Sequence, residues 1–205
     1  MEFEIIEDCS PYYIRYRHTG YEKVIQWAKT FKERFVDPNP KLKFMHVKMP
    51  LNIGTQMVDM VYKGKELQML ERRVSIFVSQ PGMYYRPHRD GLAVKMGINY
   101  TVDIRDDKCI TSWYDFKDFE GRPVDNLANN SSREIADYNR AVEKDIIKPV
   151  KSVIAKNNEV MLFNTDLYHD VDNTTSPNER TILTFRSSLF EKIDFFDARK
   201  IMFGY

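Results

Sequence analysis

From residue 73 onward the chain is divided into short runs of β-branched and aromatic residues, and this pattern limits the fold more than any other feature. RVSIFVSQ, YYRPHRD, GINYTVDI and CITSWYDF are separated by QPG, DG and RDDK, and KSVIAKN, NEVMLFNT and RTILTFRSSLF come later. Runs of this length, divided by turn residues, are typical of antiparallel strands. We therefore expect a mainly β fold with flanking helices.

Two segments follow a helical pattern instead. Residues 21–35 place Val24, Trp27, Ala28, Phe31 and Phe35 on one face, with lysine and glutamate opposite, and DPNP at 37–40 then ends the helix. We expect this helix to pack against the outside of a sheet. A second pattern, NNSSREIADYNRAVEKDI, predicts a helical insertion at about 117–150.

The length of the chain sets the number of domains. It has 205 residues, of which 42% are hydrophobic and 13% aromatic, enough for one packed core and too few for two. We expect a single domain over 1–205. It comprises N-terminal support at 1–72, a β core at 73–190 that contains the insertion, and a C-terminal extension at 191–205.

Charge and cysteine content exclude several classes of protein. Charged residues make up 30% of the chain but sum to +1, which argues against bulk nucleic acid as a partner. The start, MEFEIIEDCS, does not resemble a secretory signal, and no apolar run approaches the ~18 residues that span a bilayer. Cys9 and Cys109 suit neither a metal knuckle nor a disulfide framework. We expect reduced thiols in a cytoplasmic protein without a membrane partner.

The segment YYRPHRDG, residues 84–91, contains the first candidate metal ligands. In an extended strand, residues two apart point to the same face, so His88 and Asp90 can reach one ion. If the alternation continues through Pro87, Arg86 lies on that face as well.

A third ligand is available in LFNTDLYHDVDN, which we interpret as a strand followed by a polar turn, with His169 at the strand end. Two histidines and one carboxylate form a triad that leaves positions open on Fe(II). Zinc suits the same ligands, but no H-E-x-x-H or similar arrangement supplies the general base of a zinc hydrolase. His18 and His46 are isolated, and we expect surface or core roles for both.

The strand RTILTFR separates polar from apolar residues. Alternation places Arg180, Ile182, Thr184 and Arg186 on one face, and the apolar remainder on the other. A buried arginine needs an anionic partner, and a guanidinium group fits a carboxylate bidentately. Arg180 and Arg186 therefore suggest a clamp for a carboxylate ligand. The alternative is a strand whose polar face meets solvent.

Together, an H-x-D pair, a distal histidine and a following arginine resemble the iron(II)- and 2-oxoglutarate-dependent oxygenase superfamily. The resemblance runs from about Val74 to Leu189. YxPHxD at 85–90 is similar to the prolyl-hydroxylase-like branch, whereas RTILTFR is similar to the R-x5-R strand of AlkB-type demethylases. In NEVMLFNTDLYHDV, Asn157-Asn158 takes the turn position where that family often has glycine. The family's R-x-S signature is absent at Arg180. The resemblance implies a double-stranded β-helix (jelly-roll) core.

The resemblance also implies roles for individual residues. The iron ligands would be His88, Asp90 and His169, the distal carboxylate of 2-oxoglutarate would be bound by Arg180 and Tyr100, and Arg186 would lie near the cosubstrate. An ordinary core position is the alternative for Tyr100. The expected cofactors and cosubstrates are Fe(II), 2-oxoglutarate and dioxygen.

The implied reaction is hydroxylation of an unactivated C–H bond in a peptidyl side chain or a small metabolite, with release of succinate and CO2. Halogenating relatives replace the carboxylate ligand with a small residue, so the presence of Asp90 favours hydroxylation. Three alternatives stay open: an AlkB-like oxidative demethylase of nucleic acid, a cupin-like metal hydrolase or isomerase, and a non-enzymatic jelly-roll binding module. The sequence predicts no oligomeric state.

Overall fold

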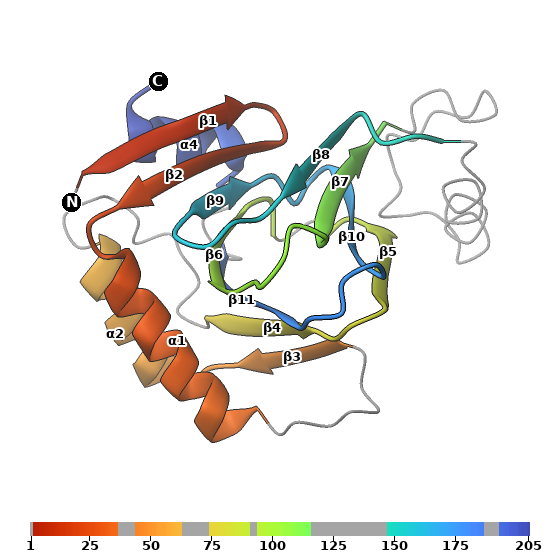
Figure 1. Ribbon diagram of the computed structural model, residues 1–205. Helices are drawn as coiled ribbons and strands as arrows, with labels where there is room; N and C mark the ends of the chain where they lie inside the picture. Colours follow the sequence, from red (N-terminus) through yellow and green to blue (C-terminus); the bar gives the residue numbers. More distant parts are fainter. Residues whose placement is uncertain (1, 37–43, 63–73, 91–93, 116–146, 187–192) are drawn as a thin grey trace.

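The computed structural model describes residues 2–36, 44–62, 74–90, 94–115, 147–186 and 193–205 (Figure 1). The helical insertion expected at about 117–150 lies almost entirely outside these residues.

The strands form two antiparallel sheets. The larger sheet has the order β1 (Phe3–Cys9), β2 (Tyr13–His18), β9 (Val160–Phe163), β6 (Gly97–Asp103), β11 (Arg180–Arg186), β4 (Ser75–Ser79) and β3 (Phe44–Lys48). The smaller sheet has the order β5 (Met83–His88), β10 (Tyr168–Asn173), β7 (Ile110–Tyr114) and β8 (Lys151–Ile154). Apart from the consecutive pairs β1–β2, β3–β4 and β7–β8, neighbouring strands come from distant parts of the sequence, as in a double-stranded β-helix, and the expected mainly β fold with that core is confirmed.

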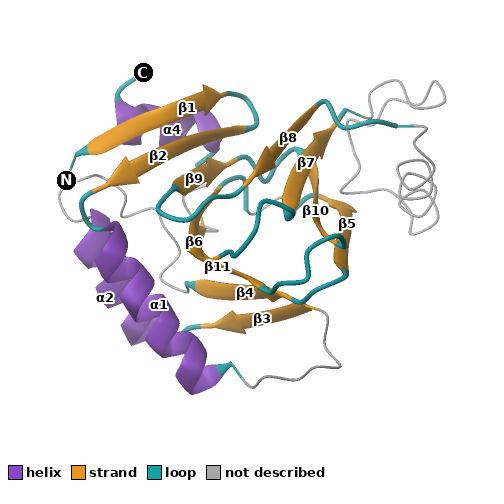
Figure 2. Ribbon diagram, in the orientation of Figure 1, coloured by secondary structure: helices purple, strands orange, loops and turns teal. Residues whose placement is uncertain are grey.

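Within the described ranges, three helices accompany the larger sheet: α1 (Tyr21–Phe35), α2 (Leu51–Tyr62) and α4 (Phe195–Phe203). Figure 2 shows them beside this sheet and away from β5, β7, β8 and β10. Their apolar residues share one cluster with alternate residues of β2, β4, β6, β9 and β11. This cluster is the main core, on the face of the larger sheet that turns away from the smaller one. No helix in the described ranges is long and apolar enough to cross a bilayer.

Helix α1 confirms the expected packing against the sheet, with two changes in its buried stripe. Val24, Ala28 and Phe31 are buried, as the pattern predicts, and Ile25 is buried with them. Phe35 is 43% exposed at the last turn of the helix, because the stripe drifts around the helix axis over its 15 residues.

Turn chemistry explains where two strands begin. Asn158 adopts a left-handed conformation, with φ of 63°, before β9, as expected for an asparagine in a glycine-like turn position. After β9, the Asn164 side chain accepts a hydrogen bond from the Asp166 amide and forms an Asx-turn. The expectation that His169 ends a strand before a polar turn is therefore wrong, because the turn precedes it and β10 begins at Tyr168.

Candidate metal centre

The pocket lies between the two sheets. A small cluster that includes Trp113 and Phe163 fills part of the inter-sheet space. Next to it lies a cavity of about 110 Å³, lined by residues from both sheets. From β11 it is lined by Arg180, Ile182, Thr184 and Arg186, the four that alternation places on one face. The two arginines therefore face the cavity rather than open solvent.

Three candidate ligands converge at this cavity. His88 is the last residue of β5, Asp90 follows two residues later, and His169 pairs with His88 across the β5–β10 ladder. Donor atoms of the three residues all lie within 4.8 Å of one another. His88 Nε2 is 3.5 Å from Asp90 Oδ1. This spacing allows one ion to contact all three side chains.

Hydrogen bonds orient both histidine rings for coordination. Nδ1 of His88 lies 2.8 Å from the Arg86 carbonyl oxygen, and Nδ1 of His169 lies 2.8 Å from the Leu167 carbonyl oxygen. A carbonyl oxygen only accepts hydrogen bonds, so each Nδ1 carries the proton and each Nε2 keeps a lone pair. Support of this kind is typical of histidines that bind metals through Nε2.

The electrostatics of the three residues suit a divalent cation. Burial lowers the pKa of His169 to about 3, with a further contribution from His88, so the ring is neutral near pH 7. Burial would raise the pKa of Asp90, but the contact with the His88 ring and the charge of Arg186 hold it below the usual value. Asp90 is therefore a carboxylate at neutral pH.

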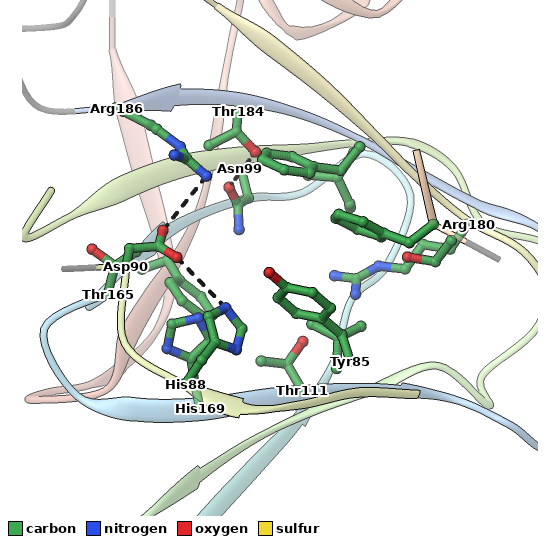
Figure 3. Close-up of a pocket in the computed structure, with 16 residues that line it drawn as sticks. Tyr85, His88, Asp90, Asn99, Thr111, Thr165, His169, Arg180, Thr184 and Arg186 are labelled. Atoms are coloured by element: carbon green, nitrogen blue, oxygen red, sulfur yellow. Dashed lines mark hydrogen bonds and ion pairs between the residues drawn. The ribbon is translucent and has the colours of Figure 1, made fainter. Parts of the chain in front are cut away.

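Arg186 approaches the second oxygen of this carboxylate. Its Nη2 lies 3.6 Å from Asp90 Oδ2, and its guanidinium carbon lies 5.2 Å from the centre of the Phe77 ring. Asp90 thus has one oxygen toward His88 and the other toward Arg186 (Figure 3).

A β-bulge in β5 changes which residues reach the cavity. On β10, His169 and Val171 are two residues apart, but they pair with His88 and Tyr85, which are three apart. Arg86 and Pro87 fill the extra step, where the missing N–H of proline cannot join the ladder. The expectation that Arg86 shares a face with His88 is wrong. Tyr85 lines the cavity instead, a consequence that strict alternation misses.

Arg180 lies on the opposite side of the cavity from the ligand triad (Figure 3). The residue is only 6% exposed. Nη1 contacts the Cys109 sulfur at 3.4 Å, while the buried Nε has no hydrogen-bond partner among the residues described. The Tyr85 hydroxyl and the Asn99 amide point into the space between Arg180 and the triad. This space thus has a cation at one end and hydrogen-bonding groups along its length.

Tyr100 is not brought together with the other predicted site residues. It is fully buried in the main core with Ile98 and Val102, and its hydroxyl lies 2.7 Å from His18 Nε2. The cosubstrate role expected for Tyr100 therefore needs correction, because alternation along β6 turns Tyr100 away from the cavity and Asn99 toward it. The GINYTVDI pattern already separates these two faces.

The other two histidines differ in their surroundings. His18 is a buried core residue, as expected. His46, on the edge strand β3, stacks on Phe77 at 4.4 Å and lies 3.0 Å from the Ser75 hydroxyl. Neither belongs to the ligand triad.

Neither protein-family models nor curated protein sequences match this chain. Several solved structures, by contrast, match this chain. HygX from Streptomyces hygroscopicus, with nickel and 2-oxoglutarate bound, aligns with a TM-score of 0.57 at 11% identity, over 86% of this chain and 82% of HygX. The non-haem α-ketoglutarate-dependent carbocyclase SnoK from nogalamycin biosynthesis gives 0.56 at 12% identity, over 86% and 79%.

A third structure, the non-haem α-ketoglutarate-dependent epimerase SnoN from the same biosynthesis, gives a TM-score of 0.55 at 8% identity, over 86% of this chain and 78% of SnoN. At these identities the likeness concerns the fold. The chain therefore has the double-stranded β-helix fold that these 2-oxoglutarate-dependent enzymes share.

Proposed function

We propose that this protein is an Fe(II)- and 2-oxoglutarate-dependent oxygenase that oxidises a C–H bond of a small molecule. The observation that carries the proposal is the pairing, in one cavity, of a His-Asp-His triad with a buried arginine opposite it. Each feature has other uses on its own. Together they match a cosubstrate that chelates a metal at one end and carries a carboxylate at the other.

The donor set supports Fe(II) as the metal. His88, Asp90 and His169 would supply two neutral imidazoles and one carboxylate, which leaves further coordination positions open. When bound, the metal would supply the chelation of the keto acid and the reaction with dioxygen. The chain's own contribution is orientation, because the carbonyl groups of Arg86 and Leu167 fix both rings.

The remainder of the cavity supports 2-oxoglutarate. Arg180 would bind the distal carboxylate, since its buried guanidinium otherwise lacks an anionic partner and its fork fits a carboxylate bidentately. Tyr85 and Asn99 would donate hydrogen bonds along the length of the cosubstrate. In this proposal Arg186 holds Asp90 rather than the cosubstrate.

The class of reaction follows from the same site. With 2-oxoglutarate bound, oxidative decarboxylation would release succinate and CO2 and drive removal of a hydrogen atom from the substrate. Hydroxylation is the expected outcome, since Asp90 keeps the carboxylate ligand. HygX has been solved with hygromycin B, and SnoN with nogalamycin RO. Both ligands are small molecules, which supports a small-molecule substrate here.

The test is an anaerobic titration of the purified protein with Fe(II) and then 2-oxoglutarate, followed by visible spectroscopy. We expect the weak charge-transfer band of the Fe(II)–keto acid chelate. His88→Ala and Asp90→Asn should abolish it, whereas Asp103→Asn should retain it, because Asp103 pairs with Arg105 at the end of β6.

Two results would contradict the proposal. One is the absence of the band in wild-type protein whose circular dichroism spectrum shows a folded chain. The other is tight binding of Zn(II) together with an unchanged response to 2-oxoglutarate in Asp90→Asn. Either result would favour the cupin-like hydrolase or the binding module.

A further inference from the structure

Four rings form a stacked ladder at one edge of the cavity. His46 stacks on Phe77 at 4.4 Å with an angle of 18° between planes, Phe77 on Phe44 at 5.6 Å and 25°, and Phe44 on Tyr85 at 4.8 Å and 18°. Three of these rings, Phe44, Phe77 and Tyr85, line the cavity itself.

The ladder lies where the space between the sheets opens. Among the described strands, β3 is the edge strand of the larger sheet and β5 the edge strand of the smaller one, so the Phe44–Tyr85 contact joins these two edge strands. Unlike the fully buried rings of the main core, Tyr85 is 39% exposed, and Phe44 and Phe77 are half-buried. Tyr85 also contacts His88, with ring centres 4.3 Å apart. A molecule at this edge therefore meets aromatic surface directly beside the triad.

Positively charged side chains lie near the His46 end of the ladder. The guanidinium of Arg186 lies over Phe77, and Lys48 is two residues beyond His46 on the same face of β3. Burial lowers the pKa of His46, and the charges of Arg186 and Lys48 lower it further. Among the described residues that line the cavity, Asp90 is the only acidic one.

The charges of the loaded site are not balanced by the cosubstrate. Arg180, Arg186 and a divalent cation would face Asp90 and the two negative charges of 2-oxoglutarate. One positive charge is left over, next to the ladder, and a substrate with one negative charge would neutralise it.

We propose that the ladder of His46, Phe77, Phe44 and Tyr85 is the substrate-binding wall, and that the substrate is a small molecule with a planar aromatic ring and an anionic group. This inference rests on the proposed function and adds the substrate class to it. A substrate ring would pack against the ladder in offset or edge-to-face geometry, the arrangements that aromatic pairs favour. The anion would lie toward Arg186 and Lys48.

The test compares three probes on protein loaded with Ni(II) and saturating 2-oxoglutarate. They are 3-phenylpropanoate, 3-cyclohexylpropanoate and 3-phenylpropan-1-ol, with Kd measured by NMR titration. The cyclohexyl probe is the more hydrophobic, so hydrophobicity alone predicts that it binds more tightly. We expect the opposite order, with the phenyl acid tighter by about threefold to tenfold. The uncharged alcohol should bind about tenfold more weakly than the phenyl acid.

Matched variants locate the effect. Phe77→Leu should remove the preference for phenyl over cyclohexyl, whereas Phe35→Leu should keep it, because Phe35 is an exposed phenylalanine on α1, outside the pocket. The inference is overturned if the cyclohexyl acid binds as tightly as the phenyl acid, if Phe77→Leu keeps the preference, or if no probe binds below about 10 mM.

Loading with Ni(II) and 2-oxoglutarate is measured first and separately. A protein that loads both but does not discriminate between the probes overturns only the substrate inference. A protein that loads neither overturns the proposed function and the substrate inference with it.

Discussion

The burial of the Arg180 guanidinium favours a role in binding an anion. A guanidinium that is 6% exposed, with an Nε that has no partner in the described part of the chain, is costly to bury unless an anion joins it. Arg180→Ala should therefore weaken 2-oxoglutarate binding by about a hundredfold or more. Arg180→Lys should lose less, because it keeps the charge but not the fork. Titration of the Ni(II)-loaded variants measures both, with Arg105→Ala as an exposed control. Equal affinities for wild type and Arg180→Ala would refute the assignment.

Arg186 contacts a candidate metal ligand, Asp90. Its 3.6 Å contact with Asp90 Oδ2 leads us to expect that Arg186→Gln weakens metal binding by about tenfold to a hundredfold, as for other partners of metal ligands. The affinity for 2-oxoglutarate, measured at saturating metal, should change much less. A reversed pattern, with intact metal binding and lost 2-oxoglutarate binding, would make Arg186 a cosubstrate ligand.

His18 ties stability to pH. Its Nδ1 accepts a hydrogen bond from the Gly20 amide, and its Nε2 lies beside the Tyr100 hydroxyl. Burial lowers the pKa of His18 to about 4. Because the unfolded chain takes up the proton first, the stabilisation is complete above an unfolded pKa of about 6.5 and declines as the pH falls toward 4. Between pH 7 and pH 4.5, urea unfolding should show a loss of about 2–2.5 kcal/mol in wild type that is missing from His18→Gln. Parallel pH profiles would contradict this.

At the scale of residues, the sequence was most informative where one simple rule applied. The triad and the cavity face of β11 follow from H-x-D spacing, a distal histidine and strict alternation. Tyr85 could not be placed in this way, because the bulge at Pro87 depends on pairing with β10. Tyr100 was misassigned by analogy, although its neighbours Ile98 and Val102 mark its face as apolar.

In addition to the backbone ladders, one buried side chain behind the site, that of Asp170, links strand β10 to both neighbouring strands. Asp170 is 3% exposed. It accepts hydrogen bonds from the Tyr114 hydroxyl on β7 at 2.6 Å, the Tyr84 hydroxyl on β5 at 3.1 Å and the Ser112 amide at 3.1 Å. Burial raises the pKa of Asp170. Since His169 precedes Asp170 directly, these bonds also fix the backbone that carries one candidate ligand.

Removing one of these donors should weaken both the fold and the metal site. Tyr114→Phe leaves a buried carboxylate short of a partner, so we expect a loss of about 1–3 kcal/mol in the free energy of unfolding and weaker Ni(II) binding. Tyr205→Phe is the matched control, since Tyr205 also donates to a carboxylate, Asp8, but is 50% exposed. It should change stability by no more than about 0.5 kcal/mol. Equal losses in the two variants would show that Asp170 has no special role.

At the scale of elements, the helical period predicted α1, and runs of β-branched and aromatic residues between turn residues predicted seven of the strands. Strands β1 to β3 and helices α2 and α4 were not predicted individually. Helix α4 begins at the capping box of Asp194 and ends at Gly204, which has φ of 86°. Each of these two signals involves only a few residues. The start of β10 depends on the Asn164 turn, whose second contact is the distant Pro11 carbonyl. Pairings of that range leave no local trace in a sequence.

At the scale of the whole molecule, the candidate site joins the two sheets. His88 and His169 belong to the smaller sheet, while Arg180 belongs to the larger. A ligand that chelates the metal and pairs with Arg180 therefore connects elements that otherwise meet through side-chain packing. Binding of such a ligand should be visible in global stability and should depend on both ends of the ligand.

We expect 2-oxoglutarate to raise Tm by about 5–10 °C at saturation when Ni(II) is present, and by much less without the metal. Succinate has a carboxylate for Arg180 but no keto-acid end, so it should stabilise less than 2-oxoglutarate. Asp90→Asn should remove the metal-dependent part of this rise in Tm. The Tm of the same variant without ligand serves as its reference. Thermal scans at matched ligand concentrations decide the point. An equal rise with and without Ni(II) would mean that the ligand binds through its carboxylates alone, and the bridging of the two sheets through a metal would then be wrong.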